Sequence, residues 1–213
     1  MAIQKRPKLS RAEQKARRPG EILEAAFDEF AEKGFAATRV EDVAARIGVT
    51  KGTVYVYFPT KEILFEEAFR HVAAVFADLR REIERLDGGY ADRLQNVLRL
   101  GYRKLADDRR VRDLLRLSLA EGIRFPEMVL RHHDEFIAPL VTAIRTVVED
   151  GVRAGELEGA AVATMPDVIG SSILHLSLWR SLFMDQRPLD EAAFIEAHLE
   201  LVRRALRPVA GAA

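Results

Sequence analysis

Apolar residues recur every three or four positions along most of the chain, and no stretch alternates between apolar and polar residues over the length of a strand. A spacing of three and four places side chains on one face of an α-helix, whereas alternation is typical of a half-buried strand. The pattern therefore predicts an all-α fold. Glycine and proline separate about nine expected helices, over residues 19–33, 38–47, 51–58, 61–86, 90–106, 109–122, 132–154, 160–184 and 190–206.

Particular residues set some of these boundaries. Pro19 fits the first turn of a helix, where its missing N–H is harmless. Thr38 and Glu41 have the spacing of a capping box at the start of the second helix. Pro139 lies inside the helix expected over 132–154 and should either kink it or mark its true start.

The stretch from Lys61 to Leu86 is long for a helix of a globular protein, about 39 Å at 1.5 Å per residue. Its apolar residues alternate at spacings of four and three, and Gly88 and Gly89 end it. We expect this helix to join two domains. The division predicted from the sequence is a disordered basic arm at 1–18, a first domain at 19–64 and a second at 65–213.

The segment from Val40 to Tyr57 meets the requirements of a helix-turn-helix. Gly48 lies at the turn, where a left-handed backbone favours glycine, and Ala44 is small where the two helices cross. Gly52 lets the backbone of the last helix approach a phosphate closely. The polar side chains that this helix can present to DNA are Thr50, Lys51, Thr53, Tyr55 and Tyr57.

Charge is unevenly distributed, although the formal net charge is zero. Residues 1–61 carry 12 Lys and Arg against 8 Asp and Glu, while the rest of the chain carries 21 against 25. Within residues 1–18, seven cations face a single carboxylate. By itself such an arm fits a solvated tail equally well, but beside a helix-turn-helix it indicates contact with a nucleic acid.

Composition excludes several other functions. The chain has no cysteine, which rules out disulfides, thiolate-bound zinc and a cysteine nucleophile and favours the reducing cytoplasm. No apolar run approaches the ~18–20 residues of a membrane span. His132 and His133 are adjacent, and no two histidines have the i,i+4 spacing that presents two ligands to one metal ion. We therefore expect a cytoplasmic protein with no membrane association, no metal and no cofactor.

The residues from Thr38 to Ala44 and from Ile47 to Leu64 resemble the signature of the TetR family of transcription regulators, and the resemblance extends over about residues 20–66. It implies a TetR-like fold, with a three-helix DNA-binding domain followed by a helical bundle. The resemblance implies that Thr38, Lys51, Gly52, Tyr55 and Lys61 face phosphates, with Arg39 as a further clamp, and that Thr50, Thr53, Val56 and Tyr57 face the bases. For Tyr55 and Tyr57 the alternative is packing beneath the helix.

A single short helix reads few base pairs, so such modules work as symmetric pairs on palindromic DNA. We expect a homodimer formed by the last two helices, because residues 167–184 are apolar nearly all round. The residues expected at this interface are Val168, Ile169, Ile173, Leu174, Leu176, Leu178, Trp179, Leu182 and Phe183, with Phe194, Ile195, Leu199, Val202 and Leu206. The alternative is that these side chains form only the core of one monomer.

The resemblance also implies that the second domain binds a small-molecule effector. Residues that combine polar tips or large rings with apolar faces are expected to line its site: Tyr102, Leu117, Glu121, Phe125, Phe136, His175 and Trp179. For each of them, ordinary core packing is the alternative. The sequence thus predicts a repressor that a largely apolar effector releases from operator DNA, and not an enzyme. Two alternatives remain. One is an activator or corepressor-dependent regulator on the same scaffold, and the other is a helical small-molecule-binding protein without operator specificity.

Overall fold

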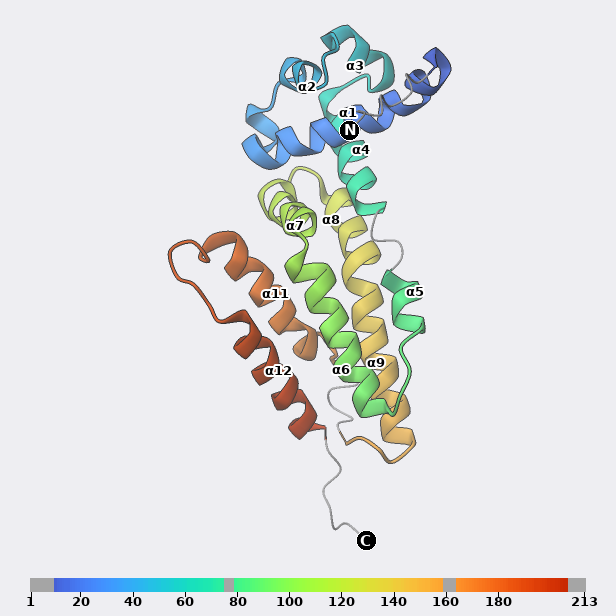
Figure 1. Cartoon of the computed structure of the whole chain (residues 1–213), viewed down its shortest axis with the longest axis vertical. Helices are drawn as coiled ribbons and strands as arrows, with labels where there is room; N and C mark the ends of the chain where they lie inside the picture. The colour runs from blue at the N-terminus through green and yellow to red at the C-terminus, as the bar shows by residue number, and fades with distance from the viewer. Residues whose placement is uncertain (1–9, 75–78, 159–163, 207–213) are drawn as a thin grey trace, which may run out of the picture. The chain divides into compact units, whose positions relative to one another are not determined.

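The computed structural model describes residues 10–74, 79–158 and 164–206, and the regular elements in these ranges are all helical. This confirms the all-α fold. Two compact units divide the chain, Met1–Val72 and Ala73–Ala213 (Figure 1). The first contains α1 (Arg11–Ala37), α2 (Val40–Arg46), α3 (Lys51–Tyr57) and most of α4 (Lys61–Ala74). The second contains α5 (Leu79–Glu84), α6 (Tyr90–Gly101), η1 (Tyr102–Asp107), α7 (Arg109–Glu121), α8 (Pro126–His132), η2 (His133–Ile137), α9 (Ala138–Arg153), α11 (Asp167–Leu182) and α12 (Glu191–Ala205).

Helix α1 begins at Arg11, so the expected start at Pro19 is wrong. The Glu13 N–H donates to the Ser10 hydroxyl (3.2 Å) and the Ser10 N–H donates to the Glu13 carboxylate (2.7 Å). This capping box satisfies donors at the helix end, and the helix then continues through Pro19. The expectation of a disordered arm is therefore wrong for its last residues, while residues 1–9 lie outside the described part.

The core of the first unit forms around three phenylalanine rings from α1, its C-terminal end and α4. The ring centroids of Phe30 and Phe65 are 4.8 Å apart, and those of Phe35 and Phe65 are 5.2 Å apart, both edge to face. Val43 of α2 and Val54 of α3 are fully buried in the same unit. Because a helix-turn-helix is too small to bury its own apolar face, α1 and α4 are needed to fix the position of α3.

In the second unit, α6 packs along α9, and α11 and α12 lie beside them (Figure 1). Its core draws on every one of these helices through the buried residues Leu94, Val97, Leu98, Ile144, Val148, Ile169, Ile173, Leu176, Leu199 and Val202. Helix α6 presents apolar residues at spacings of three and four, as expected of a helix packed on one face.

Two helices of this unit contain a wide, π-helical turn, which the periodicity did not reveal. The helix expected over 90–106 is α6 continued by η1. The one expected over 132–154 corresponds to η2 and α9, and α8 before them was not expected. The Ala138 N–H donates to the His133 carbonyl, five residues back, which is the π-helical pattern. Pro139 follows directly in the first turn of α9. Of the two alternatives expected for Pro139, a kink or a helix start, the structure shows neither in simple form: the helical backbone continues from η2 into α9, with the wide turn directly before Pro139.

Parts of two expected helices cannot be compared with the structure. The helix expected over 61–86 corresponds to α4 and α5, and residues 75–78 lie outside the described ranges. The one expected over 160–184 corresponds to α11, which begins at Asp167, and residues 159–163 are likewise outside.

Candidate functional site

Gly48 closes the turn between α2 and α3 with a φ of +67°, in the left-handed region that favours glycine. Its N–H donates to the Ala45 carbonyl (3.2 Å), and the Val49 N–H donates to the Ala44 carbonyl (2.9 Å). These two bonds satisfy carbonyls at the end of α2. A Cβ added to Gly48 would meet no atom within 4 Å, so the backbone conformation and not crowding selects glycine here.

Helix α3 buries one face and exposes the other. Val54 is fully buried, whereas Val56 is 79% exposed and Tyr55 is 36% exposed. Thr53 and Tyr57 are half-buried. The helix therefore presents an apolar side chain, a phenol and a hydroxyl to solvent, which are groups that can contact thymine methyls, phosphates and base edges.

Two threonines expected to contact DNA use their side chains to cap helices. Thr50 is the N-cap of α3, and its hydroxyl accepts from the Thr53 N–H (3.1 Å). The Thr38 side chain is buried, and its hydroxyl donates to the carbonyls of Glu29 (3.1 Å) and Gly34 (2.8 Å). The expectation that the Thr38 side chain faces a phosphate is therefore wrong, because the end of α1 takes up its only donor.

The capping box expected between Thr38 and Glu41 is also absent from α2. The N-cap of this helix is Arg39, which makes no side-chain capping bond. The Glu41 carboxylate instead lies 2.6 Å from the Nζ of Lys51, the only cation of α3. Both side chains are about half exposed. The hydrogen bond from Lys51 lowers the pKa of Glu41, and the bond to Glu41 raises the pKa of Lys51.

Replacing Glu41 by glutamine should tighten DNA binding, because Lys51 then need not leave a carboxylate to reach a phosphate. Exposed ion pairs contribute about 0–1 kcal/mol, so we expect roughly a two- to fivefold gain in affinity per half-site. The gain should appear on unrelated DNA as well, since phosphate contacts are independent of sequence. Fluorescence anisotropy titrations on both duplexes would measure it. Glu66→Gln, which removes an exposed carboxylate of α4, is the control, and an equal gain in that variant would contradict the role of Glu41.

The other predicted phosphate contacts differ in their surroundings. Lys61 donates from Nζ to the Ala36 carbonyl (3.2 Å) and lies 4.5 Å from the centroid of the Phe35 ring. Arg39 and Gly52 are exposed. Arg39 and Gly52 are thus open to solvent, whereas Lys61 already donates one of its hydrogen bonds within the protein.

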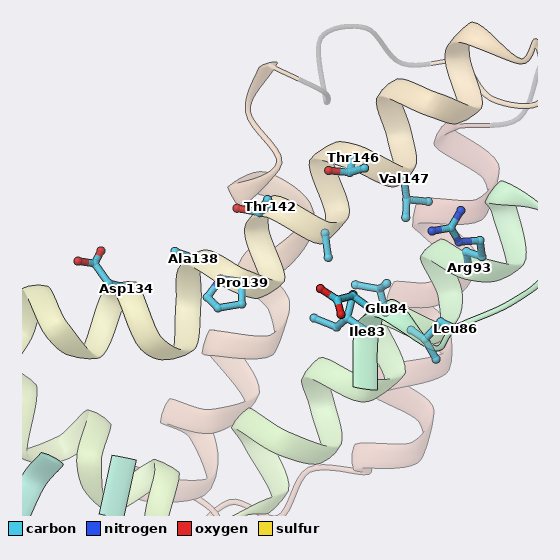
Figure 2. A pocket seen from close by; sticks show the side chains of 12 residues that line it. Ile83, Glu84, Leu86, Arg93, Asp134, Ala138, Pro139, Thr142, Thr146 and Val147 are labelled. Carbon is cyan, nitrogen blue, oxygen red and sulfur yellow. The ribbon is translucent and has the colours of Figure 1, made fainter. Parts of the chain in front are cut away.

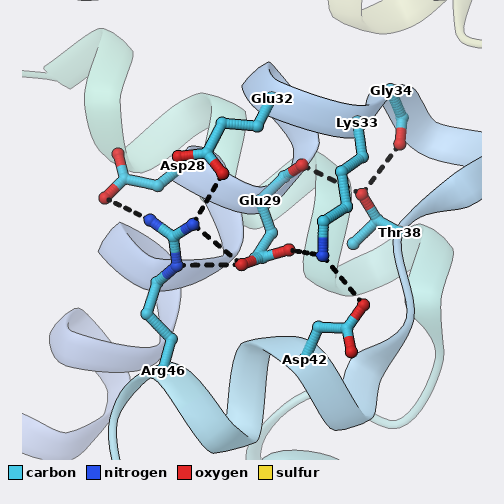
Figure 3. Close-up of polar contacts among 8 residues, drawn as sticks. All are labelled: Asp28, Glu29, Glu32, Lys33, Gly34, Thr38, Asp42 and Arg46. Atoms are coloured by element: carbon cyan, nitrogen blue, oxygen red, sulfur yellow. Dashed lines mark hydrogen bonds and ion pairs between the residues drawn. The ribbon is translucent and has the colours of Figure 1, made fainter.

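A buried carboxylate ties α1 to α2 (Figure 3). Glu29 is 5% exposed and accepts from the Nε of Arg46 (2.9 Å), while the Nζ of Lys33 lies 2.6 Å from its other oxygen. Lys33 also pairs with Asp42 of α2 at 3.0 Å. Burial opposes the charged form of Glu29, but the hydrogen bonds from Lys33 and Arg46 outweigh it, and the pKa of Glu29 is lowered.

This cluster should make the first unit sensitive to acid. A lowered pKa stabilises the folded state above pH 4.5, the ordinary value for glutamate, and this stabilisation is lost as the pH falls through the native pKa. Glu29→Gln should lower the free energy of unfolding by about 1–3 kcal/mol at pH 7. The difference in this free energy between the parent and the variant should shrink towards zero as the pH falls below the native pKa of Glu29. Urea unfolding followed by circular dichroism would test this, and a difference independent of pH would contradict it.

Several cavities lie within the second unit, one of about 230 Å³ beside α6 and α12. Of two more, the larger, about 470 Å³, runs between α5, α6 and α9. Figure 2 shows Arg93 and Asp134 at its two ends and Glu84 between them. It is lined by Ile83, Glu84, Leu86, Arg93, Val97, Asp134, Ala138, Pro139, Thr142, Ala143, Thr146 and Val147.

The second cavity, about 260 Å³, is more apolar and lies between η1, α7, α9 and α11. Both π-helical segments contribute to its walls, through Leu105 of η1 and Ile137 of η2. Wide turns of this kind occur often at functional sites. The full lining is Leu105, Val111, Leu115, His132, Ile137, Leu140, Val141, Asp167, Gly170, Ser171, Ile173, Leu174 and Ser177.

Six of the seven residues expected to line an effector site are absent from the linings of these two cavities. Tyr102 is buried, and its hydroxyl lies 2.8 Å from the Nδ1 of His198 on α12. Burial raises the pKa of Tyr102 and lowers that of His198. His175 is exposed and stacks on the Phe194 ring at 5.6 Å. The Trp179 N–H donates to the carbonyl of Arg187 at 3.0 Å.

Leu117 and Phe125 are buried, and Glu121 is half-buried. The side chain of Phe136 lies outside the described part of the structure. Whether any of these residues touches an effector stays a prediction. The cavity residues that sequence reasoning missed, such as Leu105 and Ser177, carry no distinguishing signal, since an apolar residue beside a cavity and one in a filled core have the same periodicity.

Helices α11 and α12 divide their apolar residues between the core and the surface. The second unit buries Ile169, Ile173 and Leu176 of α11. It also buries Leu199 and Val202 of α12 and Leu206, which directly follows that helix. The expectation that all of these form an interface is therefore too broad, because one monomer already buries them. Some large apolar side chains of this region remain exposed. They are Val168, Leu174 and Leu182 of α11, Phe183 directly after it, and Leu201 of α12.

Among the residues that the structure describes, no helix is both long enough and apolar enough to cross a bilayer. Nor do the same residues contain a group of three or more histidine, aspartate or glutamate side chains placed to hold a metal ion.

Comparison with known proteins extends the likeness over most of the chain. Residues 22–68 match the family model of bacterial regulatory proteins of the tetR family, and residues 93–206 match that of the AefR-like transcriptional repressor C-terminal domain. The fatty acid metabolism regulator protein of Bacillus subtilis is 25% identical over 202 residues, which cover 93% of this chain and 95% of the relative.

Solved structures agree on the fold. A transcriptional regulator from Saccharomonospora viridis in complex with choline has a TM-score of 0.74 at 16% identity, over 90% of this chain and 98% of that one. The regulator FadR from Bacillus subtilis in complex with stearoyl-CoA has a TM-score of 0.65 at 21% identity, over 87% and 98%. The chain belongs to the TetR family of transcription regulators, which are not enzymes, and it carries a C-terminal domain of the AefR-like repressor type.

Proposed function

We propose that this protein is a dimeric repressor that binds a palindromic operator through α3 and releases it when a small apolar effector occupies the second unit. The observation that carries the DNA-binding part is the solvent-facing side of α3, where Val56 is 79% exposed beside Tyr55 and Lys51. A valine so exposed gains nothing for the free protein, whereas it fits against a thymine methyl in a major groove.

Within this proposal, the DNA contacts are divided by chemistry. Affinity is set by contacts to phosphates, which are made by Lys51, Tyr55, Arg39, Gly52 and Lys61. Base preference comes from Thr53, Val56 and Tyr57, while Thr50 acts through the cap of α3. Two copies are required, because each α3 has only seven residues and reads one half-site.

The exposed side chains of α11 and α12 supply the dimer interface in this proposal. Leu182 is 58% exposed and Leu201 is 67% exposed, at positions that the unit's own core leaves uncovered. Large apolar surfaces of this kind commonly mark contacts between proteins. A pair of helices from each subunit then forms a four-helix interface.

The effector site is the cavity of about 260 Å³ lined by η1, α7, α9 and α11, because it is the more apolar of the two and touches α11 of the dimer interface. An effector shifts operator affinity only if it binds the DNA-incompetent conformation more tightly. The name of the C-terminal family model, a transcriptional repressor, favours repression over activation.

Selection of bound sites from random duplex DNA tests the proposed function. We expect an inverted repeat with half-site centres about 34–36 Å apart, one turn of the double helix. Titrating the selected operator in the presence of trial compounds then gives the sign of regulation. Recovery of no enriched sequence would contradict operator recognition, and an effector that tightened binding would indicate a corepressor.

A further inference from the structure

We propose that the cavity between η1, α7, α9 and α11 takes a compact, uncharged apolar compound that carries a hydrogen-bond donor, such as an alcohol or a phenol, and excludes carboxylates and acyl-CoA. This inference rests on the proposed function, because it names the class of effector for the same cavity. It departs from the anionic ligand of the Bacillus subtilis neighbour, which was solved with stearoyl-CoA.

The charges at the cavity disfavour an anion. Among the residues that the structure describes, its lining contains neither lysine nor arginine, and the one carboxylate among them, Asp167, is exposed. His132 is buried, and burial together with neighbouring His133 lowers its pKa to about 4, so the ring is neutral at pH 7. A carboxylate in this cavity would lose its hydration without gaining a positive partner. The larger cavity differs in this respect, because Arg93 lines it.

The serine hydroxyls of the lining have already used their protons. Ser177 donates to the Leu105 carbonyl (3.1 Å), and Ser171 donates to the Val168 carbonyl (2.8 Å). Their oxygens can still accept a hydrogen bond. Together with the Asp167 carboxylate, they outnumber the single N–H of the neutral His132 ring, so the polar part of this cavity consists mainly of acceptors. A ligand that donates a hydrogen bond satisfies them, whereas a carboxylate offers only further acceptors.

The volume of about 260 Å³ sets the size of the ligand. An apolar cavity of roughly 150 Å³ holds benzene, and sites for drug-sized molecules span about 300–1,000 Å³. The cavity therefore suits a molecule between these sizes, and a long acyl chain with its coenzyme is too large for it.

Gly170 offers a way to fill the cavity without straining the fold. It lines the cavity from α11, and a Cβ added there would meet only the Cδ1 of Ile144 at 3.8 Å, an ordinary contact. Gly170→Leu should therefore occupy the cavity, and Gly170→Ala is the matched control that leaves most of it open. Both changes also favour the helix, because glycine is a weak helix former. Val141→Phe fills the same cavity from α9.

The test measures binding of three eight-carbon probes to the full chain by calorimetry: 1-octanol, a hydrogen-bond donor; 2-octanone, an acceptor only; and octanoate, an anion. We expect 1-octanol to bind the parent and Gly170→Ala proteins at least tenfold more tightly than 2-octanone or octanoate. Binding of 1-octanol should be lost in Gly170→Leu and in Val141→Phe. Size-exclusion chromatography and thermal melts confirm that each variant remains folded and assembled.

Three results would overturn the inference: octanoate or 2-octanone binding as tightly as 1-octanol with loss in Gly170→Leu; 1-octanol binding that survives both filling variants; or no binding of 1-octanol to the parent protein. The same samples are titrated with the selected operator. If operator binding is intact while the probes disagree, only the ligand class is wrong, whereas failure to bind any DNA sequence would remove the proposed function itself.

Discussion

Replacing Leu182 and Leu201 together by aspartate should convert the proposed dimer into monomers and weaken binding to the proposed palindromic operator about 10²–10⁴-fold. These side chains are 58% and 67% exposed on α11 and α12, and two like charges facing their symmetry mates oppose association. Linking two half-site readers in one assembly gives an avidity gain of about that size, and separating them removes it. Light scattering measures the mass, and anisotropy titrations measure operator affinity.

The chain provides a matched control for this change. Leu119 and Ile123, at and just beyond the end of α7, are 67% and 103% exposed, so aspartate at both removes comparable apolar surface. This second double variant should keep the mass and operator affinity of the parent. If the α11 and α12 variant remained a dimer, or if the two variants lost affinity equally, the proposed interface would be excluded.

Replacing both Lys51 and Tyr55 by alanine should weaken binding to every duplex by about 10–100-fold. The affinity for the operator and for unrelated DNA should fall by the same factor. The loss is uniform because phosphate contacts carry no sequence information. The slope of log affinity against log salt should fall by about 2 for a dimer, since one lysine is lost from each subunit. Salt titrations with both duplexes provide the measurement.

Thr53→Ala is the comparison for this pair of alanine substitutions. If Thr53 contacts a base edge, this change should weaken the free energy of binding to the operator by about 1–3 kcal/mol and change binding to unrelated DNA little. Because Lys51 and Tyr55 are exposed, the Lys51 and Tyr55 variant should not change the melting temperature appreciably. An unchanged operator titration for the Lys51 and Tyr55 variant would refute the placement of α3 on DNA.

The fold and the helix-turn-helix could be predicted because their signals are local. Helical periodicity is repeated over the whole chain, and the conformation at Gly48 leaves a mark in the sequence, since few other residues tolerate it. The start of α1 was also marked locally, by Ser10 and Glu13, but Pro19 suggested a later start. The wide turn at η1 has no such mark, whereas the one at η2 directly precedes Pro139.

The roles of individual side chains were harder to predict, because a residue type does not reveal its partner. Tyr102 has the composition of a ligand contact, a ring with a polar tip, yet its hydroxyl meets His198, 96 positions away. Glu41 fitted a local capping box, but it pairs with Lys51 of the next helix. Such choices depend on the distances that folding creates between distant segments, and no spacing along the chain encodes them.

The pairing of Lys33 and Arg46 with the buried Glu29 bears on how the protein searches the chromosome. Sliding along random duplex depends on mobile cations that exchange one phosphate for the next. Cations fastened to a carboxylate inside the first unit take little part in this exchange. Lys33 and Arg46 should therefore add little to nonspecific binding, and the choice of a stopping point is left to the exposed side of α3.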